Sequence, residues 1–328
     1  MIVARLNLLL VLLLALVLAL GVLLGETALT SAQWRQAFAH PSSAAGEVLF
    51  AIRAPRTFAA ALVGAALGLS GAALQGLLRN PLADPAVLGV SALSGLAAAV
   101  AIALGLAIVP GAVEAFALAG ALAGGAVVTV LAVRLAEPQT LILFGVALSA
   151  GGGAATALVF NLSPSLITTS EVLSWLMGSA ANRSWADVGL ALVPMSVGAF
   201  LCAASGLGLR MLSLGEETAA VSGLPMGRLR AFAVAGAAIL TGASVAMAGV
   251  IGFVGLAAPH LVRAAAKEDP ASILAPSALA GAVLVVLADL CTRLVPTPEE
   301  LRLGVVTGLF GAPLFALVAW RAGRSWRA

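Results

Sequence analysis

Charged residues are scarce in this sequence. Only 9% of its 328 residues are Asp, Glu, Lys or Arg, whereas 62% are hydrophobic, and the mean hydropathy is +1.12. A water-soluble domain of this composition would expose large apolar surfaces, so the composition excludes a soluble protein. Because the dyad alternation typical of transmembrane strands is also absent, the sequence predicts an integral membrane protein built of helices.

Several kinds of chemistry lack the residues they need. The two cysteines, Cys202 and Cys291, stand far apart in apolar runs, which excludes a C-x-x-C metal or redox motif. The only lysine, Lys267, follows Ala266, so the phosphate-binding pattern G-x-x-x-x-G-K-[ST] cannot be written. If the protein uses ATP, another chain must supply the ATPase. The net charge of +3 comes from scattered basic residues and does not indicate a nucleic-acid partner.

Long uncharged runs make up most of the chain. An α-helix rises about 1.5 Å per residue, so roughly 20 apolar residues cross the hydrocarbon core of a bilayer. We predict a single transmembrane domain over residues 1–328 with about ten membrane helices. Their expected bounds are residues 6–25, 57–78, 86–109, 115–133, 140–160, 188–209, 231–250, 254–266, 271–290 and 303–320.

Ten crossings place both termini on one side, and the basic residues indicate which side that is. Cytoplasmic loops of membrane proteins carry an excess of Lys and Arg. Of the seventeen basic residues, the following lie on the side of the termini: Arg5, Arg79, Arg134, Arg210, Arg228, Arg230, Arg263, Lys267, Arg321, Arg324 and Arg327. The remaining six lie on the other side, so both termini are predicted to be cytoplasmic.

The segment 214–230, L-G-E-E-T-A-A-V-S-G-L-P-M-G-R-L-R, is longer than a simple connection between two spans requires. The residues from Ser213 to Glu216 have the pattern of a capping box, which predicts the start of a short helix. Gly223 and Pro225 follow in the order that ends a helix. We therefore predict a rigid lever that contacts a cytoplasmic partner.

A second short helix is predicted outside the spans, between residues 161 and 187. The sequence T-T-S-E at 168–171 also has the capping-box pattern, and V-L-S-W-L-M-G follows it. We expect an amphipathic helix that lies at the membrane surface.

Three arginines are predicted at the outer ends of different spans. These residues are Arg53, Arg56 and Arg293. An isolated arginine at such a position usually extends to the lipid interface. Three together also suit a docking surface for an acidic soluble partner, because complementary charge steers encounter and fixes register.

Glycine is abundant, with 36 residues. Pairs spaced G-x-x-x-G at 64 and 68, 120 and 124, and 304 and 308 favour close packing of helices, with a dimer contact as the alternative. In the run 140–160, Gly151, Gly152 and Gly153 each cost roughly 1 kcal/mol relative to Ala. They suit a helix that packs closely or lines a path.

The residues Gly68 to Gly71, G-L-S-G, match a pattern of intramembrane serine proteases, with Ser70 as nucleophile and His260 as a conceivable base. No His or Asn pair is placed to bind an oxyanion. We therefore favour a packing role for this serine.

Four motifs together resemble those of one transporter family. They are R-A-P-R at 53–56, G-A-A-L-G-L-S-G-A-A-L-Q-G-L-L-R-N-P-L-A-D-P-A-V-L-G-V-S at 64–91, L-G-E-E-T-A-A-V-S-G-L-P at 214–225, and A-G-V-I-G-F-V-G-L-A-A-P-H-L-V-R at 248–263. The chain resembles the permease subunits of bacterial ABC importers for iron-siderophores, haem and vitamin B12, from about residue 26 to residue 323.

The resemblance implies a multi-pass subunit of the bacterial inner membrane. It implies a homodimer with the translocation path at its interface and no catalytic residue or metal site in this chain. Two separate ABC ATPase subunits would bind ATP and Mg²⁺ on the cytoplasmic side, and a periplasmic or lipid-anchored binding protein would dock outside.

The resemblance also assigns roles to individual residues. Arg53, Arg56 and Arg293 are expected to meet acidic residues of the binding protein. Contact with the ATPase is expected from Leu214, Gly215, Glu216, Glu217, Ala220, Gly223, Leu224, Pro225 and Arg228. By their position, the residues expected to line the path are Ser149, Gly151, Gly152, Gly153 and Thr156.

The substrate within the family is not readable from the sequence. We expect an iron chelate first and cobalamin second. An ion-coupled secondary transporter is the alternative of a different class, and it is disfavoured because such a protein should place ionisable residues near mid-membrane.

Overall fold

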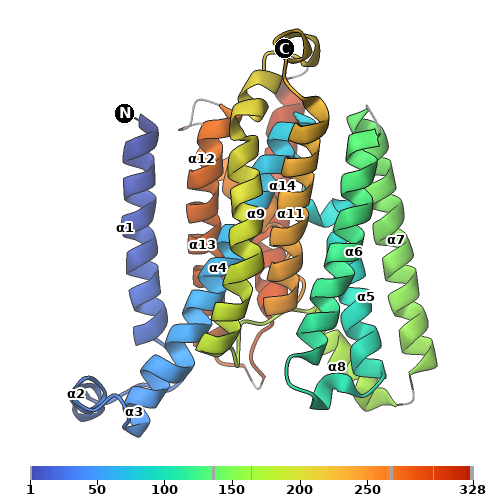
Figure 1. Cartoon of the computed structure of the whole chain (residues 1–328). Coiled ribbons are helices and arrows are strands. Elements are labelled where there is room, and N and C mark those ends of the chain that lie inside the picture. The colour runs from blue at the N-terminus through green and yellow to red at the C-terminus, as the bar shows by residue number, and fades with distance from the viewer. Residues whose placement is uncertain are drawn as a thin grey trace.

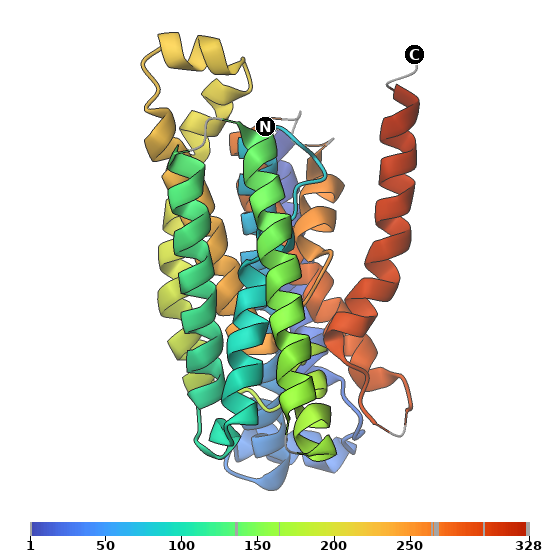
Figure 2. The same cartoon turned by 90° about the vertical axis from the view of Figure 1, so that its right-hand side faces the viewer.

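The computed structural model consists of helices that run side by side along one axis (Figure 1, Figure 2). It describes residues 2–134, 137–163, 165–263, 265, 269–297 and 299–325, and these residues contain no strand. The prediction of an all-α membrane protein is confirmed. Helices suit this environment because each one satisfies its own backbone hydrogen bonds where lipid offers no partner.

The N-terminal helices cover one edge of the bundle. They are α1 (Ile2–Leu23), α2 (Ser31–Ala39), α3 (Ala44–Glu47) and α4 (Ala54–Leu78). A π-helical turn, Val48–Arg53, joins α3 to α4 without interruption. The predicted span 57–78 therefore lies inside a longer helical segment.

The middle of the chain forms the opposite edge and part of the centre. Its helices are α5 (Val90–Ala103), α6 (Ala112–Arg134), α7 (Pro138–Leu162), α8 (Leu166–Leu176), α9 (Trp185–Leu212) and α10 (Glu216–Val221). Short 3-10 turns at Pro85–Leu88 and Leu106–Ile108 flank α5.

The remaining helices are α11 (Met226–Ala248), α12 (Val254–Arg263), α13 (Pro270–Leu294) and α14 (Leu303–Ser325). The centre of the bundle is built by α4, α11 and α13, and α4 packs against both of the others. α1 lies outside this centre and packs mainly against α13 (Figure 1).

Seven helical segments of the described chain are long and apolar enough to cross a membrane. They are Ile2–Leu23, Ala44–Leu78, Ala112–Arg134, Gln139–Leu162, Trp185–Leu212, Met226–Ala248 and Pro270–Leu294. Two shorter apolar helices are Val90–Ala103 and Leu303–Pro313. A multi-pass membrane protein is thus confirmed, whereas the number of ten crossings stays a prediction.

The predicted span 86–109 is wrong as one continuous helix. Gly89 has φ +80° and Gly105 has φ +74°, so the backbone leaves the helical path at both glycines. The helix between them is only α5. Of the predicted span 254–266, α12 covers Val254–Arg263, and residues 264 and 266 lie outside the described residues.

The glycines of α4 let backbones meet at the centre of the bundle. A Cβ atom on Gly64 would overlap the carbonyl oxygen of Gly281 in α13, and a Cβ on Gly281 would overlap that of Gly64. Gly68 meets the Ser277 carbonyl in the same way. The packing role predicted for the Gly64–Gly68 pair is therefore confirmed, within one chain.

The two ends of the bundle differ in what they carry (Figure 1). α2, α3 and α8 lie at one end, which we call the α8 end. α10 lies at the other, the α10 end, together with the start of α1 and the last described turn of α14 (Figure 2).

Candidate functional site

The segment 214–230 projects from the α10 end as a short helix with defined ends. Gly215, at φ +113°, precedes the first residue of α10. At the far end Gly223 adopts φ +82°. The Leu224 N–H donates to the Ala219 carbonyl at 3.1 Å, and the Gly223 N–H donates to the Ala220 carbonyl at 3.0 Å. These two bonds form a Schellman motif, so Gly223 ends the helix as predicted.

The predicted capping boxes are wrong, although both short helices exist. α10 has no side-chain cap, and the Ser213 hydroxyl donates instead to the Arg210 carbonyl at 2.7 Å. α8 begins at Leu166, ahead of the predicted T-T-S-E start, because Ser165 accepts from the Thr168 N–H. Local sequence patterns of this kind compete with other hydrogen-bonding partners of the same residues.

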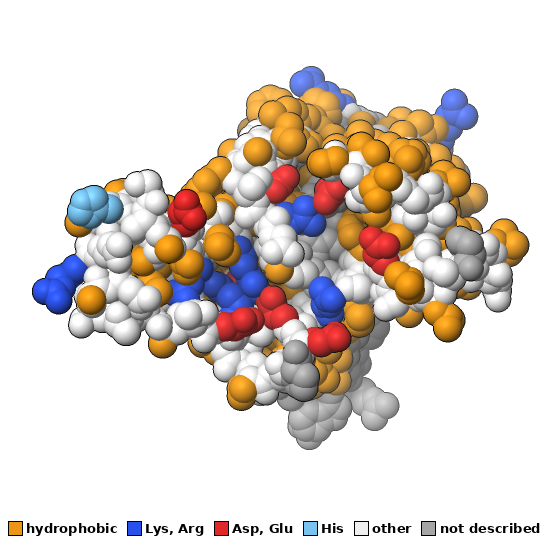
Figure 3. Space-filling view, turned by 90° about the horizontal axis from the view of Figure 1, so that it is seen from below, with side chains coloured by type: hydrophobic (Ala, Val, Ile, Leu, Met, Phe, Trp, Pro, Cys, Tyr) orange, Lys and Arg blue, Asp and Glu red, His pale blue; other side chains and the backbone are white. Residues whose placement is uncertain are grey.

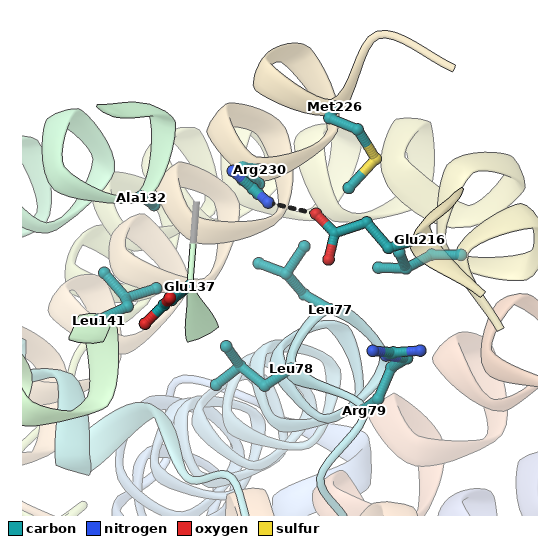
Figure 4. Close-up of a pocket in the computed structure, with 10 residues that line it drawn as sticks. Leu77, Leu78, Arg79, Ala132, Glu137, Leu141, Glu216, Met226 and Arg230 are labelled. Atoms are coloured by element: carbon teal, nitrogen blue, oxygen red, sulfur yellow. Dashed lines mark hydrogen bonds and ion pairs between the residues drawn. The ribbon is translucent and has the colours of Figure 1, made fainter. Parts of the chain in front are cut away.

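An ion pair fixes α10 to α11. Arg230 Nη2 lies 2.6 Å from Glu216 Oε1 (Figure 4). The pair borders a pocket with Leu77 and Leu78 from the end of α4 and Met226 from the start of α11. The pair thus links the first turn of α10 to α11, whereas the Schellman motif ends α10 through bonds of its own backbone.

The residues expected to contact an ATPase divide into two groups by their exposure. Leu214, Glu217, Ala220, Gly223, Pro225 and Arg228 are exposed. Gly215, Glu216 and Leu224 are partly buried. Arg228 places its guanidinium 5.0 Å from the centre of the Phe232 ring, which orients a positive charge beside α10. The contact with an ATPase stays a prediction.

The loop between α4 and α5 also lies at the α10 end and carries a titratable group. Asp84 Oδ1 accepts from the Ala86 N–H at 2.8 Å and caps the following 3-10 turn. Burial raises the pKa of the Asp84 carboxyl, and the Ala86 hydrogen bond opposes that rise. Asp269, which caps α13, shows the opposite shift, because the Arg210 guanidinium holds its pKa below the usual value.

At the α8 end, the three predicted docking arginines turn into the protein. Arg53 and Arg293 are only 6% and 5% exposed. Arg53 donates to the carbonyls of Leu23 and Thr27, at 3.0 and 2.6 Å. Arg293 donates to the Gly21 carbonyl at 2.9 Å. Both guanidiniums therefore bind the chain at the end of α1.

Asp289 and Glu300 complete this arginine network. Arg56 Nε lies 2.9 Å from Asp289 Oδ1, and Arg56 also binds Glu300 and, at 3.2 Å, the Thr292 hydroxyl. Arg293 lies 2.8 Å from the second Asp289 oxygen. Figure 3 shows basic and acidic side chains close together at this end. The docking role of the arginines stays a prediction, since each is already engaged within the chain.

Three partners of the predicted site residues are not evident from the sequence. They are Arg230, Asp289 and Glu300. Their spacing gives no local signal, because Arg56 and Glu300 are 244 residues apart in the chain. Asp289 could have indicated a buried partner for these arginines, because it is an acidic residue at the edge of an apolar run.

The residues predicted to line a path occupy two faces of α7. Gly152 packs against Ala92 of α5, and the Thr156 hydroxyl donates to the Gly152 carbonyl at 2.9 Å. Ser149 donates to the Val87 carbonyl at 3.4 Å. In contrast, a Cβ on Gly151 or Gly153 would meet nothing within 4 Å. The path itself stays a prediction, but α7 presents an open face of small residues.

A family model matches residues 11–321 of this chain, which is nearly its whole length. The chain belongs to the FecCD transport family. The recognition of this family from the four sequence motifs is therefore confirmed. Members are permease subunits of ABC transporters, which makes this chain a multi-pass inner membrane protein and a transport subunit without catalytic chemistry of its own.

Relatives extend over most of this FecCD-family chain. The ABC transporter permease protein YvrB of Bacillus subtilis is 39% identical over 287 residues, covering 85% of this chain and 80% of YvrB. The vitamin B12 import system permease protein BtuC of Citrobacter koseri is 38% identical and that of Salmonella typhimurium 39% identical, each covering 86% of both chains.

A solved structure of the same architecture has a TM-score of 0.84 to this chain. It is an inward-facing conformation of a metal-chelate type ABC transporter, 29% identical, and the match covers 97% of this chain and 99% of that one. The relatives therefore include both a vitamin B12 system and a metal-chelate system, and the substrate of this FecCD-family chain is a matter for proposal.

Ser70 shows no arrangement suited to a protease. It is fully buried, and its hydroxyl donates to the Leu67 carbonyl at 2.9 Å. A nucleophilic serine requires a base that accepts this proton. The neighbouring glycines of the G-L-S-G pattern contact the backbone of other helices, including Gly255 at Gly71. The pattern therefore serves packing in this FecCD-family fold.

Proposed function

We propose that this chain is the permease subunit of an ATP-driven importer for a bulky metal chelate, which it carries inward by alternating access. An iron chelate, a siderophore or haem, is the first candidate and vitamin B12 the second. The substrate class is supported by one observation, which is that the relatives agree on a chelated metal. Vitamin B12 is a chelated cobalt, and the structural relative is described as a metal-chelate type transporter.

Two ABC ATPase subunits, carrying ATP and Mg²⁺, bind the α10 end on the cytoplasmic side. This assignment is supported by the excess of arginine at that end and by the exposed face of α10. Because α10 is held to α11 through Glu216 and Arg230, a movement of the ATPase would pass directly to a central helix of the bundle.

Two copies of the subunit associate, with the path between them. The open face of α7 supports this arrangement, because Gly151 and Gly153 leave room for the close approach of another surface. Ser149 and Thr156 bond to backbone carbonyls on the other face of α7, so few polar groups of this helix would line such a path. A path with few polar groups suits a large cargo that must not be bound tightly.

A substrate-binding protein, periplasmic or lipid-anchored, docks at the α8 end. Complementary charge at Arg53, Arg56 and Arg293 would guide it, with Arg56 as the most accessible of the three, since Arg53 and Arg293 are buried. Since Arg56 already binds Glu300, an acidic residue of the binding protein would have to compete with Glu300 for the same guanidinium.

The test is reconstitution of the chain with its ATPase subunit and binding protein in proteoliposomes. Uptake of a radiolabelled ferric siderophore is compared with uptake of radiolabelled cobalamin and of free iron, each with and without ATP. We expect ATP-dependent uptake of the ferric chelate. Preferential uptake of cobalamin would support the second candidate.

Two outcomes would contradict the proposal. Uptake driven by an ion gradient without any ATPase would indicate a secondary transporter. Cleavage of a model transmembrane substrate that is abolished by Ser70→Ala, with uptake unaffected, would indicate the protease alternative.

A further inference from the structure

A groove opens between α6 and α9 near the α8 end. Both helices pack against α11, and the residues of α11 at the base of the groove, Ala243, Ala246 and Met247, are buried. Leu118, Leu190 and Pro194 contribute to its sides. Its volume is about 300 Å³, within the range of roughly 300–1,000 Å³ typical of ligand pockets. The lining is predominantly apolar, so the groove suits a hydrocarbon chain.

A polar pocket of about 380 Å³ adjoins this groove. Arg183 and Glu114 line both spaces. These two side chains form an ion pair, with Arg183 Nη1 2.8 Å from Glu114 Oε1, and are 16% and 35% exposed. The ion pair therefore marks a boundary, with an apolar space on one side and a polar space on the other.

The polar pocket carries charges of both signs in equal number. Among its lining residues, Arg183 and Arg302 are basic, and Glu114 and Glu171 are acidic. An anionic headgroup would favour a surplus of basic residues. A headgroup with one positive and one negative charge matches a pocket that provides both signs, and Asp187, which lines the adjoining groove, further disfavours an anionic headgroup.

We propose that the groove and the pocket together bind one zwitterionic phospholipid of the ethanolamine type from the leaflet at the α8 end. An acyl chain fills the groove between α6 and α9. The phosphate faces Arg183 and Arg302, and the ammonium group faces Glu114 and Glu171. The surrounding bilayer supplies the ligand, and burial of its chain contributes about 0.8 kcal/mol per CH₂ group.

The lipid would influence how the central helix α11 packs against its neighbours. Its chain separates α6 from α9 and rests on the last turns of α11, whose first turn carries Arg230. Lipid binding here would not depend on the transported substrate, because no residue that lines the groove or the pocket belongs to α7.

The experiment is native mass spectrometry of the full chain, purified in mild detergent after incorporation into bilayers of equal phosphatidylethanolamine and phosphatidylglycerol content. We expect one phosphatidylethanolamine to remain on each subunit through delipidation. Ala115→Phe, which places a ring at the wall of the groove, should reduce this occupancy about tenfold. Ala123→Phe, on an exposed part of α6 outside the groove, should leave it unchanged.

A charge variant tests the headgroup separately. Glu171→Gln removes one of the three acidic groups of the combined site and should shift retention from phosphatidylethanolamine towards phosphatidylglycerol, whereas Glu217→Gln at the α10 end should not. Gel filtration and thermal unfolding verify that each variant is folded. Equal retention of both lipids by the wild type, equal occupancy in the two Phe variants, or a metal chelate bound in place of the lipid would overturn the proposal.

Discussion

Glu216 and Arg230 are 14 residues apart in the chain, and their side chains meet at 2.6 Å across the turn that separates α10 from α11. The short helix is thereby attached to the first turn of a long central helix. A connection made only of flexible backbone would absorb a displacement of α10. We propose that the ion pair transmits such a displacement to α11.

Breaking this pair should weaken coupling without unfolding the protein. Glu216→Gln in the reconstituted transporter should lower substrate uptake per ATP hydrolysed about threefold to fivefold, as expected for a partly exposed ion pair of up to ~1 kcal/mol. Glu217→Gln, one residue further on and exposed, is the matched control and should have little effect. The double charge reversal Glu216→Arg with Arg230→Glu should recover part of the loss. Unchanged coupling in Glu216→Gln would show that the pair is not a transmission element.

Asp289 should be the most stability-sensitive carboxylate at the α8 end. It is fully buried between Arg56 and Arg293. Asp289→Asn leaves the buried Arg293 guanidinium without its counter-charge and leaves Arg56 with Glu300 alone, and removal of one partner from a buried ion pair costs about 3–5 kcal/mol. Thermal unfolding in detergent should therefore show a large fall in midpoint. Asp269→Asn, which removes the partner of the exposed Arg210, should cause a much smaller fall. Similar midpoints for the two variants would contradict this account.

Glycines at two sites should respond in opposite directions to the same substitution. Gly71→Ala would drive a methyl group into the Gly255 carbonyl, and overpacking of this kind typically costs about 1–3 kcal/mol. Gly153→Ala meets nothing within 4 Å and should stabilise α7 by up to about 1 kcal/mol through helix propensity. Thermal unfolding compares the two directly, and uptake assays then show whether the open face of α7 tolerates a methyl group.

The buried carboxyl group of Asp84 should make the stability of the protein depend on pH. Because burial raises its folded-state pKa, the charged carboxylate destabilises the fold at neutral pH. Stability from this group rises as the pH falls through the raised pKa and levels off below the ordinary value near 3.8. Asp84→Asn keeps a side-chain acceptor for the Ala86 N–H without the charge.

The variant should consequently unfold at a higher temperature than the wild type at neutral pH, and the two curves should converge in acid. Asp269→Asn provides the opposite sign, since the depressed pKa of Asp269 contributes stability at neutral pH that is lost as the pH falls through it. A gap between wild type and Asp84→Asn that widens in acid would be incompatible with a raised pKa.

The sequence predicts the long helices well, because hydropathy and length alone define them. The run 140–160 lies within α7, and 271–290 lies within α13. The prediction fails at 86–109, where the apolar run continues through two glycines whose positive φ values end the helix. Hydropathy records which residues avoid water, but not where the backbone turns.

Only those parts of the site that depend on local sequence patterns could be predicted. Gly223 and Pro225 reveal the end of α10 because both act on their own backbone. The inward orientation of Arg56 depends on Asp289, 233 residues away in the chain, and no property of either neighbourhood indicates the pairing. Tertiary contacts of this kind require the folded arrangement of α4 and α13.

The reciprocal contact of Gly64 with Gly281 restricts where this transporter can move. Because the two backbones touch here with no side chain between them, we expect α4 and α13 to move as one unit. In the alternating-access mechanism proposed above, the rocking movement would leave this pair of helices together. A cross-link between α4 and α13 should then leave transport intact.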